Sequence, residues 1–239
     1  MSSTSTQLTQ VTVRALALGG KFIGDGVGYA TVTISQANKV LAKGTTGEGT
    51  PRFSDGSGIT GLIMAEPYPW GAPVRADDST AFTASLAITV PTLVTITVQA
   101  PASSTWASQA VTVSAQRWIL PGLNLTGQCA VVLVVPGLLV GWNGPRLIAS
   151  GGAISASVHM MCGCAIDNLF WPGENFNVVA NLTPKGGGAT TPVPLTWSST
   201  STFSGPVAAA AGTYDVRVFA VEVLNGNTGS ATGTLTITK

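Results

Sequence analysis

Apolar and polar residues alternate with a period of two along most of this 239-residue chain. Such alternation is typical of β-strands that bury one face and expose the other. Threonine and β-branched residues, which favour strands, occupy many of the alternating positions. We find no convincing apolar stripe at the helical period of about 3.6 residues. We therefore predict an all-β protein with these apolar strand faces: Val11, Val13 and Ala15; Ala30, Val32 and Ile34; Phe82, Leu86, Ile88 and Val90; Val94, Ile96 and Val98; Val111, Val113 and Ala115; Phe176, Val178, Ala180 and Leu182; Tyr214, Val216 and Val218; Leu235 and Ile237.

Turns rich in glycine, proline and asparagine separate the expected strands, as they do in antiparallel β-sandwiches. The strand rhythm is interrupted at ILPGLNLTG, residues 119–127, by a Pro-Gly pair. We therefore expect two immunoglobulin-like β-sandwich domains in tandem, at residues 1–120 and 121–239. Residues 44–80 are too many, and too rich in glycine and proline, for a simple hairpin. We expect this stretch to be an ordered excursion from the first domain.

Two parts of the chain resemble known families of β modules. GYATVTISQANKVLAKGTT (28–46) looks like the start of a carboxypeptidase-regulatory-like or transthyretin-like module, and FTASLAITVPTLVTITVQA (82–100) resembles the strand pair that follows there. This resemblance covers about residues 8–100. The segments FNVVANLTPKGGG, PVPLTWSS, GTYDVRVFAVEV and TGTLTITK resemble a generic immunoglobulin-like or fibronectin-like sandwich, over about residues 127–239. Both resemblances imply binding or structural modules, and neither implies catalytic residues. The first is carried by Ala30, Val32, Ile34, Leu41, Gly44 and Thr45.

Charged residues are scarce and balanced. They make up 9% of the chain, and the formal net charge is +1. No cluster of lysine or arginine offers a phosphate backbone a binding surface, so we expect no nucleic-acid partner. Few charges and a net charge near zero also remove the usual repulsion between copies, which favours association.

The apolar segments do not predict a membrane span. The most apolar one, CAVVLVVPGLLVGW (129–142), is too short for a membrane helix and contains a Pro-Gly pair. The N-terminal sequence MSSTSTQLTQ has no basic start followed by an apolar run, so no secretory signal is visible. The abundance of serine, threonine and glycine nevertheless suits an extracellular or cell-surface protein.

Candidate catalytic groups do not form a recognisable constellation. Of the ten carboxylate residues, Asp77 and Asp78 are adjacent, and neighbours on a strand point to opposite faces. They therefore do not form the facing pair that acid–base hydrolysis requires. His159 is the single histidine, and no serine lies in a G-x-S-x-G elbow. We expect no catalytic residues and no enzymatic activity.

The segment HMMCGC, residues 159–164, concentrates the chain's soft metal ligands. If the strand GAISASV continues through it in phase, Met160, Cys162 and Cys164 lie on the core face and His159 on the opposite face. Cysteines packed in a core behave as small apolar residues. Convergence of sulfur and imidazole would need a break in the strand, for which Gly163 is the available position.

Alternative interpretations of this segment remain open. Thiolate, thioether and imidazole groups suit copper or zinc, so His159, Met160, Cys162 and Cys164 form a candidate metal or redox site. A disulfide between Cys129 and one member of the pair is a further alternative. Core packing, with no cofactor, is the interpretation that the strand phase favours.

The sequence as a whole favours a non-enzymatic structural protein that associates with copies of itself or with other protein subunits in a filament, surface layer or complex. Trp70 in the excursion and Leu235 and Ile237 in the C-terminal strand are the candidate interaction residues, since a strand edge can add to a neighbouring sheet. One alternative is a metal-binding or redox accessory protein that uses the sulfur-rich segment. Another is a carbohydrate-binding surface module that uses Tyr68 and Trp70.

Overall fold

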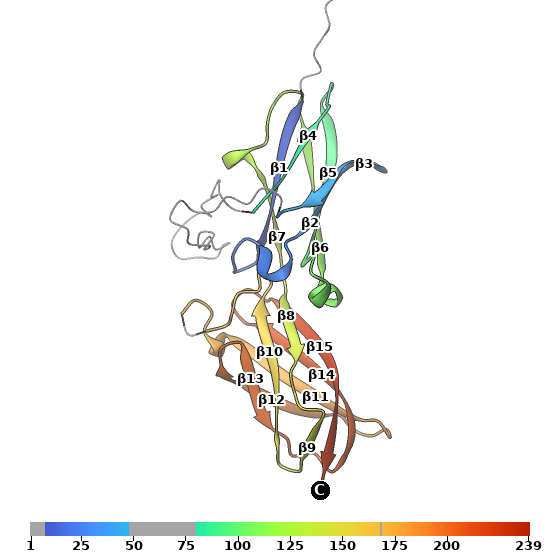
Figure 1. Ribbon diagram of the computed structural model, residues 1–239, viewed down its shortest axis with the longest axis vertical. Coiled ribbons are helices and arrows are strands. Elements are labelled where there is room, and N and C mark those ends of the chain that lie inside the picture. Colours follow the sequence, from blue (N-terminus) through green and yellow to red (C-terminus); the bar gives the residue numbers. More distant parts are fainter. Residues whose placement is uncertain (1–7, 48–79, 168) are drawn as a thin grey trace, which may run out of the picture. The chain divides into compact units, whose positions relative to one another are not determined.

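The computed structural model describes residues 8–47, 80–167 and 169–239. These residues form strands and four short 3-10 helices, so the predicted all-β class is confirmed (Figure 1). In this part of the chain, no helix is long and apolar enough to cross a membrane. The chain divides into two units, residues 1–135 and 136–239. The 3-10 helices are η1 (Asp25–Val27), η2 (Ser104–Gln109), η3 (Gly127–Cys129) and η4 (Gly173–Asn175).

One sheet of unit 1 has four strands and is antiparallel throughout. Its two central strands bury the predicted apolar faces, such as Val32 and Ile34 of one strand and Ile96 of the next, at 0% exposure. Threonine and serine occupy the alternate positions and lie on the outer face, because successive side chains point to opposite sides of a strand. The strand order is β3 (Lys39–Thr45), β2 (Thr31–Gln36), β5 (Thr92–Ala100) and β6 (Val111–Ile119).

The other sheet of unit 1 has three strands, with β1 at its centre. Every residue of β1 except Gln10 is buried, as expected for a strand covered on both sides. The two sheets approach closely at Gly44, where a Cβ atom would collide with the ring of Phe82. The strand order is β4 (Phe82–Leu86), β1 (Thr9–Ala17) and β7 (Val131–Val135), with β1 and β4 antiparallel and β1 and β7 parallel.

The observed division between the units falls after β7, whereas the sequence suggested a division at residues 120 and 121. The segment that follows Pro121 stays with unit 1 because it hydrogen-bonds to β1. The Thr12 N–H donates to the Leu125 carbonyl, and the Leu125 N–H donates to the Gln10 carbonyl, both at 2.8 Å. The chain then enters β7, which pairs with β1 in register. The Pro-Gly pair therefore marks a turn inside unit 1.

Unit 2 is a continuous ladder of eight strands that folds into a sandwich. β12 belongs to both layers: its first half pairs with β11, and its second half pairs with β13, with a register shift between Trp197 and Ser199. The β8 end of the ladder packs over β15, where a Cβ at Gly233 would meet the indole of Trp142. The order is β8 (Leu138–Trp142), β10 (Ala153–Met160), β13 (Thr202–Pro206), β12 (Thr191–Ser199), β11 (Phe176–Pro184), β14 (Gly212–Glu222), β15 (Thr228–Thr238) and β9 (Leu147–Ala149).

Candidate functional site

The sulfur-rich segment is a tight turn at the end of β10. The strand ends at Met160, and the Gly163 N–H donates to the Met160 carbonyl at 2.8 Å. Gly163 has a φ of 76°, in the left-handed region that glycine adopts without strain. The Met160 N–H in turn bonds the Cys164 carbonyl at 3.1 Å, and Ala165 forms a bridge with His159. The predicted strand through residue 164 is therefore wrong, because the chain reverses at Gly163.

Cys162 and Cys164 are joined by a disulfide across this turn, with Cα atoms 5.3 Å apart. Cys129 is a free cysteine and is exposed, so the alternative in which it pairs with one of the others is wrong. In this form the two sulfur atoms are bonded to each other and do not serve as thiolate ligands for copper or zinc. The described residues contain no group of three or more His, Cys, Asp or Glu side chains arranged to hold a metal ion.

The buried surroundings of the turn confirm part of the strand phase and correct the rest. Met160 is 0% exposed, as predicted for the core face. Met161, predicted on the opposite face, is also buried at 1%, because the turn rotates it inward. Cys162 is 8% exposed, and Cys164 is partly exposed. The segment packs mainly as part of the core of unit 2.

Ser201 ties this turn to the rest of unit 2, although no sequence pattern distinguishes it within the surrounding serine- and threonine-rich stretch. Its side-chain oxygen accepts the Ile166 N–H at 3.0 Å and lies 3.2 Å from Nδ1 of His159. Its backbone N–H donates to the Ile166 carbonyl at 2.8 Å, and its carbonyl accepts the Val158 N–H at 2.9 Å. The backbone of Ser201 reaches this position with a φ of 54°.

The pair of Ser201 and His159 is a structural contact and is badly placed for nucleophilic catalysis. Ser201 is only 5% exposed, so its hydroxyl cannot meet a substrate in solution. Desolvation by burial lowers the pKa of His159 below its ordinary value, which favours the neutral imidazole. The hydroxyl, the imidazole and the Ile166 amide thus hold the turn against β10.

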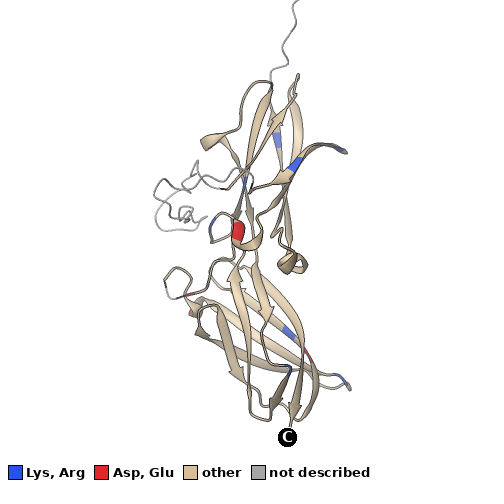
Figure 2. Ribbon diagram, viewed as in Figure 1, with Lys and Arg blue, Asp and Glu red and all other residues tan. Residues whose placement is uncertain are grey.

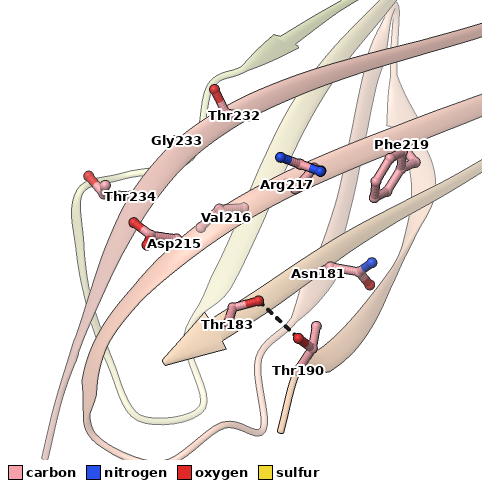
Figure 3. A pocket seen from close by; sticks show the side chains of 10 residues that line it. All are labelled: Asn181, Thr183, Thr190, Asp215, Val216, Arg217, Phe219, Thr232, Gly233 and Thr234. Atoms are coloured by element: carbon pink, nitrogen blue, oxygen red, sulfur yellow. Dashed lines mark hydrogen bonds between the residues drawn. The ribbon is translucent and has the colours of Figure 1, made fainter. Parts of the chain in front are cut away.

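A second feature of unit 2 is a shallow hollow on the outer face of β11, β14 and β15 (Figure 3). The strand register places Asn181, Arg217 and Thr232 in one cross-strand row and Thr183, Asp215 and Thr234 in the next. Thr183 also bonds the Thr190 hydroxyl at 2.9 Å. These are small hydroxyl groups with one charge of each sign, and Phe219 is the aromatic ring among the lining residues. The hollow is open to water and lacks a buried polar group that would fix a ligand.

The Asp215 carboxylate in this hollow also forms an exposed ion pair with Lys185. Lys185 Nζ lies 3.5 Å from its Oδ1, and both side chains are at least half exposed. Exposed pairs of this kind contribute at most about 1 kcal/mol to stability. The hollow is therefore best described as a solvated sheet face.

Unit 1 exposes a group of large apolar side chains at one end of β5 and β6. We call Val90, Leu93, Trp118, Leu120 and Leu123 the Trp118 patch. Their exposed fractions are 63%, 38%, 62%, 42% and 56%. Leu93 and Trp118 lie directly opposite each other in the register of the two strands, and the Leu123 N–H donates to the Leu120 carbonyl in the turn that follows.

The strand alternation contains a signal for this patch. Trp118 shares its parity with Thr112, Ser114 and Gln116, which are polar, and this places it on the outer face of the sheet. Val90 was predicted on the apolar face of a strand, but β4 ends at Leu86 and Val90 lies beyond it. Large exposed apolar residues that lie side by side, as Leu93 and Trp118 do, are typical of surfaces that contact other proteins.

Leu235 and Ile237, predicted as interaction residues of the C-terminal strand, are buried inside unit 2. Leu235 is 0% exposed and Ile237 is 2% exposed, so both side chains belong to the core of unit 2. Their strand, β15, is paired on both sides, with β14 and with the short strand β9. The prediction that these residues contact a neighbour is therefore wrong. Tyr68 and Trp70, predicted for carbohydrate or protein contacts, lie outside the described residues.

No family model matches the sequence, and no curated protein matches it significantly. Among solved structures, the fibronectin(III)-like modules of Clostridium thermocellum CbhA share 10% sequence identity with a TM-score of 0.28, over 96% of this chain and 92% of that one. The chicken interferon gamma receptor alpha chain shares 13% with a TM-score of 0.32, over 88% and 85%. Three N-terminal domains of the bacteriophage RB49 outer capsid protein Hoc share 9% with a TM-score of 0.26, over 96% and 70%.

These neighbours are fibronectin III-like and immunoglobulin-like β-sandwich domains. Because every one of these TM-scores is below 0.5, the fold assignment rests on the strand pairing of the two units themselves.

Proposed function

We propose that this chain is a non-enzymatic structural protein whose units associate with other copies of the same chain in a larger assembly, such as a filament or surface layer. The observation that carries the proposal is the Trp118 patch. It places five large apolar side chains at one end of a small unit, where water covers them in the isolated chain. Burying such side chains against a second copy would be favourable by about 25 cal/mol for each Å² removed from water.

The charge distribution supports association between identical chains. Lysine, arginine, aspartate and glutamate residues are sparse along the described strands of both units (Figure 2). With a net charge of +1, two copies repel each other weakly at any ionic strength. Two identical surfaces can therefore come into contact without strong electrostatic repulsion between the copies.

The disulfide supports a location in an oxidising compartment, in line with the serine- and threonine-rich composition. Disulfides form and persist outside the cell and are rare in the cytosol. An assembly at the cell surface or in the extracellular space agrees with this chemistry.

The proposal is tested by sedimentation velocity of the full chain over a wide range of protein concentrations. We expect the native chain to sediment as a dimer or larger species at high concentration. The variant Trp118→Lys/Leu123→Lys should shift this equilibrium toward the monomer, because both charges enter the apolar contact.

The matched control is Leu147→Lys. Leu147 is as exposed as the patch residues, at 60%, but it lies in unit 2. This variant should associate as the native chain does. A native chain that stays monomeric at the highest concentration, or a control variant that dissociates equally, would overturn the proposal.

A further inference from the structure

The strand β6 is a long sheet edge with few of the features that usually prevent edge-to-edge pairing, and its one charged residue is Arg117, at the same parity as Val113 and Ala115. Proteins blunt exposed edges with short strands, charged residues (lysine above all), inward-pointing charges, proline or bulges. The opposite edge of the same sheet, β3, carries Lys39 and Lys43 and has a register shift against β2. β6 has nine residues, VTVSAQRWI, which pair with β5 without any shift and include neither lysine nor proline. Within the described part of the chain, β5 is the one strand that pairs with β6, although β7 of the other sheet packs close to it.

The burial of β6 indicates that its apolar face is incompletely covered. Val111, Val113 and Ala115 point toward the sandwich interior, yet each remains partly exposed. The corresponding residues of the neighbouring strand, such as Val98, are fully buried. A strand added beyond β6 would cover these side chains and satisfy the outward N–H and C=O groups of its backbone.

We propose that β6 pairs antiparallel with β6 of a second copy, so that two four-stranded sheets join across a two-fold axis. This inference rests on the proposed function and specifies the surface that carries it. A two-fold axis perpendicular to the sheet makes the same residues meet on both sides, which closes the contact as a dimer. The Trp118 patch adjoins the C-terminal end of the paired strand.

The sequence of β6 selects the register. Opposite residues in an antiparallel pair share a face of the sheet, so the two-fold axis must pass through a residue. An axis at Ala115 pairs all nine residues, with Val111 opposite Ile119, and other centres leave residues unpaired. It places Arg117 opposite Val113 of the second copy, whereas an axis at Arg117 would place two guanidinium groups together.

The outer face agrees with the same register. With the axis at Ala115, Trp118 lies opposite Thr112 of the second copy, and Ser114 lies opposite Gln116. Aromatic and β-branched residues at directly opposed positions stabilise a sheet. Each indole would thus pack over the threonine methyl group of the other chain.

Charge exchange at Ser114 and Gln116 tests the pairing, because both side chains are exposed on the outer face. Within one chain, the change removes the hydrogen bond between the Thr97 and Ser114 hydroxyls, at 3.0 Å. The variant Ser114→Lys/Gln116→Lys sets like charges opposite each other twice and should weaken the dimer by about tenfold or more. Ser114→Lys/Gln116→Glu sets opposite charges together and should keep it. Mixing the double-Lys variant with Ser114→Glu/Gln116→Glu should restore a dimer that contains one chain of each.

The matched control is Thr228→Lys/Ser230→Lys, which adds the same two charges at exposed positions of β15. It should dimerise as the native chain does. If the double-Lys variant in β6 dimerises as well as this control, the pairing is overturned.

Cysteine cross-linking tests the register directly. In a Cys129→Ser background, Ala115→Cys should form a disulfide-linked dimer under mild oxidation, because Cα atoms of directly opposite residues lie about 4.5–5.5 Å apart, within the range of disulfides. Ser114→Cys should cross-link poorly, because it faces Gln116 and not itself. Equal cross-linking at both positions would overturn the register.

These outcomes separate the inference from the proposed function. Suppose that the chain associates through the Trp118 patch but neither cross-links at residue 115 nor responds to the charge exchange. This result would support the proposed function and contradict the β6 pairing. A chain that is monomeric at every concentration would contradict both the proposed function and the β6 pairing.

Discussion

At the scale of single residues, Ser201 and His159 determine how the sulfur-rich turn is held. Nothing in the sequence distinguishes Ser201 from the serines and threonines beside it, because its role depends on a left-handed backbone and on Ile166, which is distant in sequence. His159 was visible as the single histidine, and its predicted orientation away from the core face agrees with its partial exposure. Its hydrogen-bond partner comes from a separate turn and could not be inferred from strand phase.

Replacing Ser201 with alanine should destabilise unit 2 by about 1–3 kcal/mol, because the buried Ile166 N–H and the His159 imidazole lose a partner. Urea denaturation followed by circular dichroism measures this loss. The matched variant is Ser198→Ala, whose hydroxyl makes an exposed bond to the Thr202 carbonyl, and it should cost less than about 0.5 kcal/mol. Equal losses in both variants would contradict the role assigned to Ser201.

The lowered pKa of His159 predicts a dependence of stability on pH. Between the folded-state pKa and the ordinary value of 6.5, the unfolded chain binds more protons than the folded chain. The contribution of His159 to the free energy of unfolding should therefore be fully present above pH about 6.5. It should decrease as the pH falls through that value toward the folded-state pKa. Urea titrations at several pH values measure it.

The variant His159→Asn isolates this effect from the carboxylates, which titrate in both chains. The difference in unfolding free energy between native and variant chains should change across the acid side of pH 6.5 and stay constant above it. A difference that is the same at every pH would show that His159 does not titrate differently on unfolding.

At the scale of elements, strand phase predicted burial well and strand ends poorly. Ile154, Ala156, Val158 and Met160 of β10 are buried as the alternation required. The same alternation continued through Cys162, but the left-handed glycine reversed the chain. Alternation reports which face a residue takes and carries no information about where pairing stops. β15 shows the same limit, since its edge is covered by β9, a strand of three residues that is too short to produce a pattern.

The Cys162–Cys164 disulfide should contribute modestly to stability. It closes a loop of only three residues, for which the entropic gain in the unfolded chain is roughly 1–2 kcal/mol. The variant Cys162→Ser/Cys164→Ser should therefore stay folded, with a slightly lower melting temperature, since backbone bonds at Met160 also hold the turn. Reductant should lower the melting temperature of the native chain by the same amount and leave the variant unchanged. Loss of cooperative unfolding in the variant would contradict this.

At the scale of the whole molecule, the sequence predicted two β-sandwich units but not the point that divides them. The turn at Pro121 interrupts the strand pattern, and pairing between distant strands is invisible in a local pattern. β7 lies beyond that turn and belongs to unit 1 because it is the parallel partner of β1. The exposed Trp118 was readable from its parity in β6, whereas Val90, Leu120 and Leu123 lie outside the strands, in segments whose geometry only the folded chain defines.

The division after β7 predicts how fragments behave. A fragment of residues 1–135 should unfold cooperatively, because it keeps both edges of its three-stranded sheet. A fragment of residues 1–120 lacks β7 and leaves one side of the buried strand β1 exposed, so it should be markedly less stable or unfolded. Thermal melts followed by circular dichroism compare the two. Equal stability of the fragments would contradict the division.

Sedimentation velocity tests self-association through the β6 end of unit 1. The experiment compares the full native chain with Ser114→Lys/Gln116→Lys and with the control Thr228→Lys/Ser230→Lys. We expect a concentration-dependent dimer or larger species for the native and control chains, and a shift of about tenfold or more toward monomer for the β6 variant. A native chain that remains monomeric up to its solubility limit would contradict it.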